Sequence, residues 1–206
     1  MGNGMQESRA VLFDLDGVLV DSKEAWYQLV NATARKFCKP DIPRKSFDAG
    51  WGQGIDADLR DFFPGCSHAE IEAFYVDHLL DFDAKIAVEQ DARESMLKLR
   101  DGGILRAVIT ITPTFLARDI LAAVGLIGLV DITVGASDRV PPKPAPDVIT
   151  VACTALEIAP AEALVVGDLR FDEQAARAAK APFVGFRMES ARSVKSLSDV
   201  VRLVLR

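Results

Sequence analysis

Short apolar runs alternate with amphipathic stretches along most of the chain after residue 86. The runs are bounded by glycine, proline or polar residues, which is typical of buried strands, whereas the stretches repeat their apolar residues at helical spacing. A further short apolar run lies near the N-terminus. The pattern predicts strands at 11–13, 104–109, 130–134, 163–166 and 182–186, and helices at 91–101, 115–124, 147–156, 172–180 and from 198 to the end.

Residues 23–85 show a different pattern, with helical periodicity and no strand signal. Asp21 can cap a first helix, with Glu24 three residues later as in a capping box. Ser67 and Glu70 have the same spacing in front of a later apolar stripe. The segment is therefore interpreted as a small all-helical unit.

Alternation of strands and helices favours a parallel sheet covered by helices on both faces. The helical unit, which also contains a short predicted helix at 55–63, interrupts this arrangement directly after the first strand. We therefore expect an α/β core domain made of residues 1–22 and 86–206, and a helical domain made of residues 23–85.

Composition narrows the classes of function. Twenty-four Lys and Arg against 30 Asp and Glu give a formal charge of -6, which argues against a broad nucleic-acid surface. The first ten residues lack the apolar core of a signal peptide, and no stretch is long and apolar enough for a membrane span. Cys38, Cys66 and Cys153 form no C-x-x-C pair and are expected to be reduced thiols. These features predict a cytoplasmic protein with no membrane or nucleic-acid partner; the oligomeric state stays open.

Two carboxylates follow the first predicted strand. Asp14 and Asp16 are one residue apart, and side chains at that spacing share a face of an extended chain. Two like charges held close together are costly unless a cation or a shared proton relieves them. The pair therefore indicates a chemical role more than a packing role. The alternative is that Asp14 and Asp16 only cap a turn.

Further polar residues follow other predicted strands. Thr110 ends one apolar run, and Asp168 directly follows another, with Asp172 four residues on. Lys143 lies in a loop stiffened by prolines. Ligands of open parallel sheets bind at the carboxyl ends of the strands, so these side chains can meet at one edge.

These four segments resemble, in order and spacing, the motifs of the haloacid dehalogenase-like hydrolase superfamily. The resemblance implies a Rossmann-like, three-layer core with an inserted helical cap. It also implies that Asp14 is the nucleophile that takes up a phosphoryl group, and that Asp16 acts as general acid and then as general base. Asp14, the main-chain carbonyl of Asp16, and Asp168 would hold Mg²⁺, a hard cation that prefers oxygen ligands.

The same resemblance assigns the phosphate contacts. Thr110 matches the hydroxyl residue that binds a phosphoryl oxygen, with Thr112 as the alternative because the strand end is uncertain by a residue or two. Lys143 matches the lysine that neutralises phosphate and nucleophile. Asp172 either supports the metal from a distance or caps the helix that follows it.

Asp16 separates this chain from two branches of the superfamily, the haloacid dehalogenases and the phosphonate hydrolases, which lack an acid at that position. A phosphate ester needs a proton on its leaving oxygen, and Asp16 can supply it. The expected function is a Mg²⁺-dependent phosphatase of a small phosphorylated metabolite, similar to phosphoglycolate phosphatases. A sugar-phosphate mutase of the β-phosphoglucomutase type is the alternative, and a non-catalytic metabolite-binding protein of the same fold is a third.

We expect the helical unit to determine which substrate is bound. Residues 50–54 contain three glycines, which allow backbone shapes suited to a loop that approaches a ligand. Trp51 offers a flat apolar wall and Gln53 a donor and an acceptor. Trp51 fits equally well as part of the core of the helical unit.

Overall fold

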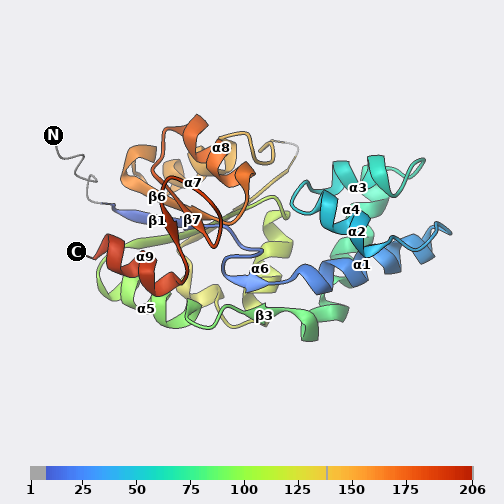
Figure 1. Ribbon diagram of the computed structural model, residues 1–206, viewed down its shortest axis with the longest axis horizontal. Helices are drawn as coiled ribbons and strands as arrows, with labels where there is room; N and C mark the ends of the chain where they lie inside the picture. The colour runs from blue at the N-terminus through green and yellow to red at the C-terminus, as the bar shows by residue number, and fades with distance from the viewer. Residues whose placement is uncertain (1–7, 138, 206) are drawn as a thin grey trace. The chain divides into compact units, whose positions relative to one another are not determined.

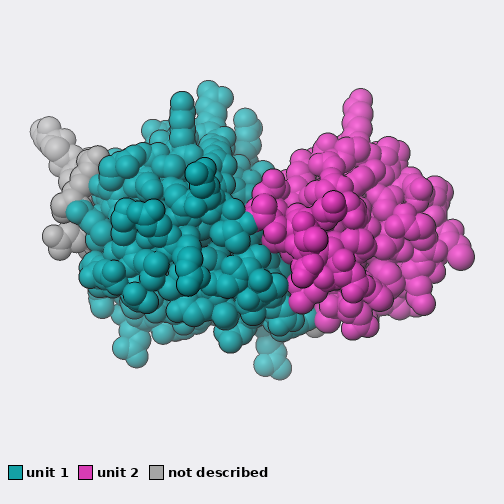
Figure 2. Space-filling view, turned by 90° about the horizontal axis from the view of Figure 1, so that it is seen from below, with its two compact units in different colours: residues 1–20, 88–206 teal, residues 21–87 magenta. Residues whose placement is uncertain are grey.

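The computed structural model describes residues 8–137 and 139–205. The chain divides into two compact units, residues 1–20 with 88–206 and residues 21–87 (Figure 2). Both crossings between the units fall in strands of two residues, β2 (Val20–Asp21) and β3 (Ala87–Val88), which form a separate two-stranded sheet. Among the described residues, no helix is long and apolar enough to cross a membrane.

The larger unit is built on a six-stranded parallel sheet in the order β5-β4-β1-β6-β7-β8. Strand β1, which pairs with β4 and β6, consists entirely of fully buried apolar residues, as expected for a strand covered on both faces. This architecture confirms the predicted α/β fold class. The strands are β1 (Ala10–Phe13), β4 (Leu105–Thr110), β5 (Ile132–Gly135), β6 (Ala163–Gly167), β7 (Phe183–Phe186) and β8 (Ser193–Val194).

Helices cover both faces of this sheet. Figure 1 shows α7 and α8 on one side, where their apolar residues share a core with Ala10 and Leu12 of β1. Side chains alternate along a strand, so Val11 and Phe13 point to the opposite face, on the side of α5 and α9. The helices of this unit are α5 (Ala92–Asp101), α6 (Thr114–Ala123), α7 (Asp147–Ala155), α8 (Arg170–Ala179) and α9 (Leu197–Val204), with 3₁₀ turns η2 (Ile127–Leu129) and η3 (Pro160–Glu162).

The smaller unit is helical. Its elements are α1 (Lys23–Lys36), α2 (Arg44–Gly50), α3 (Ile55–Asp61), α4 (His68–His78) and the 3₁₀ segment η1 (Leu79–Lys85). Buried apolar residues such as Leu29, Ile71 and Leu79 form its interior. Asn31 of α1 fixes the loop that follows, because its side chain accepts from the Ile42 amide at 2.9 Å. Helix α2 was not predicted, since seven residues of mixed polarity after a proline give little periodic signal.

The predicted caps have mixed outcomes. The capping box of Ser67 and Glu70 is confirmed: each side chain bonds the main-chain amide of the other. Asp21 is not the N-cap residue of α1, which is Ser22 without a side-chain capping bond, but Oδ1 of Asp21 does accept from the Lys23 amide in the first turn at 3.4 Å. Glu24 instead accepts hydrogen bonds from Arg44 and Gln28, so an available ion pair replaces the capping box.

A partly buried carboxyl links two helices of the smaller unit. The Tyr75 hydroxyl on α4 donates to Oδ2 of Asp58 on α3 at 2.8 Å. The Tyr75 ring also meets Trp26 of α1 edge to face, with centroids 5.6 Å apart. Burial raises the pKa of Asp58 to about 6, despite the opposing hydrogen bond from Tyr75. Ionised Asp58 is therefore costly in the folded protein.

We expect the stability of the protein to carry a pH dependence that comes from Asp58. A carboxyl whose pKa is higher in the folded than in the unfolded state binds its proton more tightly when folded, so its contribution to stability is largest at low pH. That contribution falls as the pH rises from about 4 to about 6 and is lost above that range. Asp58→Asn keeps an acceptor for Tyr75 but cannot ionise. Relative to wild type it should gain on the order of 1–3 kcal/mol between about pH 4 and about pH 7.5.

Thermal melting of both proteins across this pH range measures the effect. Asp56→Asn is a matched control on the same helix, because the Asp56 side chain is exposed and its charge is not among those that shift the pKa of Asp58. A constant difference between wild type and Asp58→Asn at every pH would contradict the assignment.

Candidate active site

Three neighbouring strands deliver polar residues to one edge of the sheet. The register aligns Phe13 of β1 with Val108 of β4 and Val166 of β6. Asp14 therefore lies level with Gly167, the last residue of β6, and one step before Thr110, the last residue of β4. The Asp14 amide donates to the Val166 carbonyl at 2.9 Å. The expectation that these strand ends meet at one edge holds in the structure.

Lys143 joins this edge from the loop between β5 and α7. Its Nζ donates to Oδ1 of Asp14 at 2.8 Å, to Oδ1 of Asp172 at 2.5 Å and to the Ile109 carbonyl at 3.5 Å. The side chains of all three charged residues are less than a tenth exposed. A buried ammonium with two carboxylate partners is a fixed electrostatic element, unlike a solvated loop lysine.

Asp172 binds the lysine and also a main-chain amide at the start of α8. Helix α8 begins at Arg170, so Asp172 lies in its first turn and is not its N-cap residue. Its Oδ2 accepts from the Leu169 amide at 3.0 Å, while Oδ1 binds Lys143. Gly167 makes this position possible, because a Cβ at Gly167 would lie 2.3 Å from the Cβ of Asp172.

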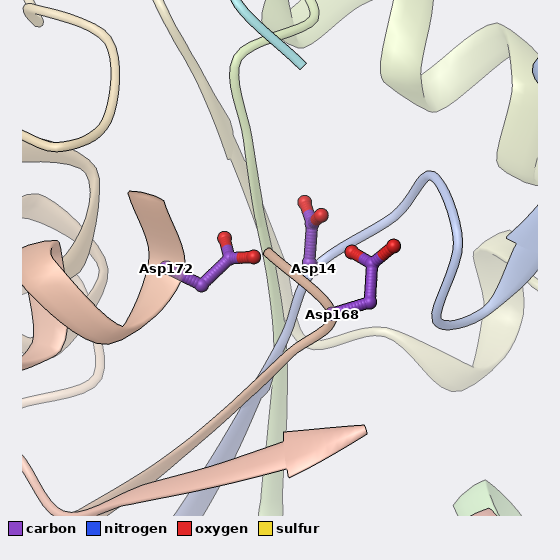
Figure 3. A group of neighbouring side chains, drawn as sticks. All are labelled: Asp14, Asp168 and Asp172. Carbon is purple, nitrogen blue, oxygen red and sulfur yellow. The ribbon is translucent and has the colours of Figure 1, made fainter. Parts of the chain in front are cut away.

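Asp14, Asp168 and Asp172 form an acidic cluster (Figure 3). Each offers one carboxylate oxygen, and these oxygens lie within 4.8 Å of one another. Oδ1 of Asp168 is buried and has no hydrogen-bond partner among the described residues. Gly17 packs against the same carboxylate, since a Cβ there would come within 2.2 Å of its Oδ2. An unsatisfied carboxylate oxygen beside two others fits a hard cation such as Mg²⁺.

The electrostatics of the cluster support that reading. Burial raises the pKa of Asp14 well above its ordinary value; Lys143 opposes this, while the neighbouring carboxylates add to it. Burial and the charge of Asp172 raise the pKa of Asp168 to about 7. Burial disfavours the Lys143 ammonium, but Asp14 and Asp172 outweigh it, so the pKa of Lys143 lies above its ordinary value. Burial is thus the main cause of both raised carboxyl pKa values and the neighbouring carboxylates add to it, whereas a bound cation would favour the ionised forms.

Asp16 lies outside that side-chain cluster. Its Oδ2 accepts a hydrogen bond from the Thr112 hydroxyl at 3.1 Å. Thr110 ends β4, and its own Oγ1 accepts from the Thr112 amide at 3.1 Å. The two threonines that the sequence left as alternatives therefore differ in position and partner. The expected metal contact of Asp16 through its main-chain carbonyl stays a prediction.

Sequence reasoning missed three features of this edge. Gly17 and Gly167 are needed for close approach, and the signal for them was present in D-x-D-G and in the G-D pair after β6. The contact between Thr112 and Asp16 had no signal, because residues 96 positions apart meet only through the path of the loop after β4.

Trp51 and Gln53 lie in the helical unit. The Trp51 ring packs against Phe47 with centroids 5.6 Å apart, and Lys23 Nζ lies 5.7 Å from its centre. Gln53 is exposed, and its side-chain amide donates to the Ala49 carbonyl at 3.2 Å. These contacts belong to the helical unit itself, and an approach of either residue to substrate stays a prediction.

Known proteins resemble this chain along nearly its whole length. Phosphoglycolate phosphatase of Xanthomonas campestris pv. campestris is 30% identical over 205 residues, covering 96% of this chain and 93% of that protein. The structure of a haloacid dehalogenase-like family hydrolase from Streptococcus pneumoniae superimposes with a TM-score of 0.80 at 19% identity, covering 96% of this chain and 98% of that one. A mutant of CbbY from Rhodobacter sphaeroides, solved in complex with xylulose-(1,5)bisphosphate, gives a TM-score of 0.81 at 21% identity, covering 93% and 96%.

The sequence profile of haloacid dehalogenase-like hydrolases matches residues 11–186. This range starts inside β1 and ends with β7, so it contains the whole acidic edge and the Lys143 loop. The chain therefore belongs to the haloacid dehalogenase-like hydrolase family, in the branch that contains phosphoglycolate phosphatases.

Proposed function

We propose that this hydrolase is a Mg²⁺-dependent phosphatase that cleaves a small phosphorylated metabolite through an aspartyl-phosphate on Asp14. The observation that carries the proposal is the buried ion pair of Lys143 with Asp14, 2.8 Å apart at the end of the central strand and beside the carboxylates of Asp168 and Asp172. A nucleophile of this kind needs a fixed position and a cation at hand, and the cluster supplies the first through Lys143.

Two displacements at phosphorus complete the proposed reaction. A carboxylate oxygen of Asp14 attacks phosphorus, the bond to the leaving oxygen breaks, and Asp16 gives that oxygen a proton. A water molecule then attacks the phosphorus of the aspartyl-phosphate while Asp16 takes one of its protons, and the bond between phosphorus and the Asp14 oxygen breaks. Inorganic phosphate leaves, and Asp14 and Asp16 return to their starting states.

Negative charge on the phosphoryl oxygens is the main electrostatic demand of both steps. The Thr110 hydroxyl and the Lys143 ammonium are the proposed partners of those oxygens. Asp14, the main-chain carbonyl of Asp16, and Asp168 would hold Mg²⁺, with Asp172 in support. When bound, the ion neutralises phosphate charge and orients the phosphoryl group toward Asp14.

The substrate class follows from the relatives and from the division of the chain. Relatives at about 30% identity are phosphoglycolate phosphatases, which supports a small phosphorylated metabolite as substrate. The core residues handle the phosphoryl group, so discrimination between leaving groups requires contacts elsewhere. We propose that the helical unit, predicted at 23–85 and compact over 21–87, is a cap that supplies them through Trp51 and Gln53.

Release of inorganic phosphate from phosphoglycolate should require a divalent ion. All proposed ligands are oxygen atoms, so Mg²⁺ should restore activity after treatment with a chelator. A colorimetric phosphate assay before chelation, after it and after adding Mg²⁺ measures this. Undiminished release in the chelated sample would refute the metal assignment. Conversion of β-glucose 1-phosphate to glucose 6-phosphate without phosphate release would favour a mutase.

Removing the nucleophile and removing the acid should have different effects. Asp14→Asn keeps the side-chain size but lacks the attacking carboxylate, so turnover should be abolished. Asp16→Asn loses only proton transfer and should slow turnover about 10²–10⁴-fold. Steady-state rates with melting curves for both variants test this, and near-normal activity of Asp14→Asn would exclude it as the nucleophile.

Substitutions in the glycine-rich loop should change substrate preference. Trp51→Ala and Gln53→Ala remove proposed leaving-group contacts, so relative kcat/KM values across a panel of phosphate esters should shift. Hydrolysis of p-nitrophenyl phosphate, whose leaving group is generic, should suffer less. The packing of Trp51 on Phe47 offers the competing outcome, in which Trp51→Ala lowers the melting temperature and leaves the ranking of substrates unchanged.

A further inference from the structure

Thr112, which the sequence left as the alternative to Thr110, contacts a proposed catalytic group. It lies in the loop after β4 and is 5% exposed. Its hydroxyl donates to Oδ2 of Asp16 at 3.1 Å. A buried hydroxyl aimed at the carboxyl group that is to transfer protons can control how that group is presented to a substrate.

The main chain of Thr112 is held from two sides. Its amide donates to the Thr110 hydroxyl at 3.1 Å, which ties the loop to the end of β4. On the other side Gly135, the last residue of β5, lies so close that a Cβ there would come within 2.1 Å of the Thr112 carbonyl oxygen. The Gly135 amide also donates to the Thr114 hydroxyl at 2.8 Å. The loop is thus fixed to two strands, so the backbone position from which the Thr112 side chain projects is also fixed.

The direction of the hydrogen bond has a consequence for Asp16. A threonine hydroxyl carries one proton, and here that proton is given to Oδ2. This bond holds Oδ2 toward Thr112 and so fixes the orientation of the Asp16 carboxyl group. Because a β-branched side chain has few χ1 states, Thr112 also restricts rotation of the carboxyl group.

We propose that Thr112 is a positioning residue that orients the Asp16 carboxyl group toward the leaving oxygen. The inference rests on the proposed phosphatase function and adds to it a role for Thr112 that differs from phosphate binding. The proposal gives the two threonines different roles: Thr110 binds a phosphoryl oxygen, and Thr112 orients the carboxyl group of Asp16.

Dependence on the leaving group separates this role from the alternatives. An alkoxide is a poor leaving group and needs a proton, whereas 2,4-dinitrophenolate leaves without one. Loss of acid positioning should therefore penalise alkyl phosphates selectively. Loss of a contact to the phosphoryl group would penalise all esters alike, since every ester carries the same group.

The experiment compares Thr112→Val, which keeps the shape but lacks the hydroxyl, with Thr112→Ser, which keeps the hydroxyl. The value of kcat/KM is measured with phosphoglycolate and with 2,4-dinitrophenyl phosphate, because it reports the step in which the leaving group departs. Thr112→Val should lose about 10–100-fold with phosphoglycolate and less than about threefold with the aryl ester. Thr112→Ser should recover most of the loss.

Gly135→Ala provides a second route to the same result, because its methyl group would displace the Thr112 carbonyl without altering the hydroxyl. It should show the same selective loss with phosphoglycolate. Melting temperatures of all variants establish that they fold.

Three outcomes would overturn the inference. Equal losses with both esters would make Thr112 a phosphoryl contact, and a lowered melting temperature with unchanged kcat/KM would make it purely structural. Absence of phosphate release from either ester by the wild type would overturn the proposed function on which the inference rests.

Discussion

The burial of Lys143 between Asp14 and Asp172 is the constraint on which the rest of the site depends. An ammonium that is removed from water must be paired, and here each of its contacts comes from a different element: the end of β1, the first turn of α8 and the main chain of β4. Loss of one partner in such a group typically costs about 3–5 kcal/mol, because the remaining charges stay buried and uncompensated. The lysine therefore fixes the loop between β5 and α7 to the centre of the sheet.

That constraint explains the small residues at the same edge. Asp172 can reach the lysine only because Gly167 leaves room beneath it, and Asp168 can turn toward Asp14 only because Gly17 lacks a side chain. Gly17 also has a φ of +92°, a backbone state that other residues rarely adopt. The two glycines therefore affect the electrostatics of the site, because they determine how closely the carboxylates approach one another.

The sequence predicted the layers and the meeting of the strand ends better than it predicted local detail. Apolar runs identify buried strands because burial on both faces leaves no polar positions, as at β1 and β6. The two-residue strands β2, β3 and β8 are too short to produce a pattern. Caps failed where a competing partner was available, as with Glu24 and Arg44. Side-chain pairings such as Thr112 with Asp16 depend on loop paths, and no periodicity records them.

In the proposed mechanism, the nucleophile and the acid are held in position by different interactions in different parts of the larger unit. The nucleophile is fixed by charge, through Lys143, whereas the acid is fixed by a neutral hydroxyl from a loop pinned between β4 and β5. A cationic partner would favour the ionised form of Asp16, whereas a group that gives and then takes a proton needs both forms. A threonine hydroxyl stabilises an orientation while leaving both protonation states accessible. The chemistry that the two aspartates are proposed to perform thus requires the different partners that the fold gives them.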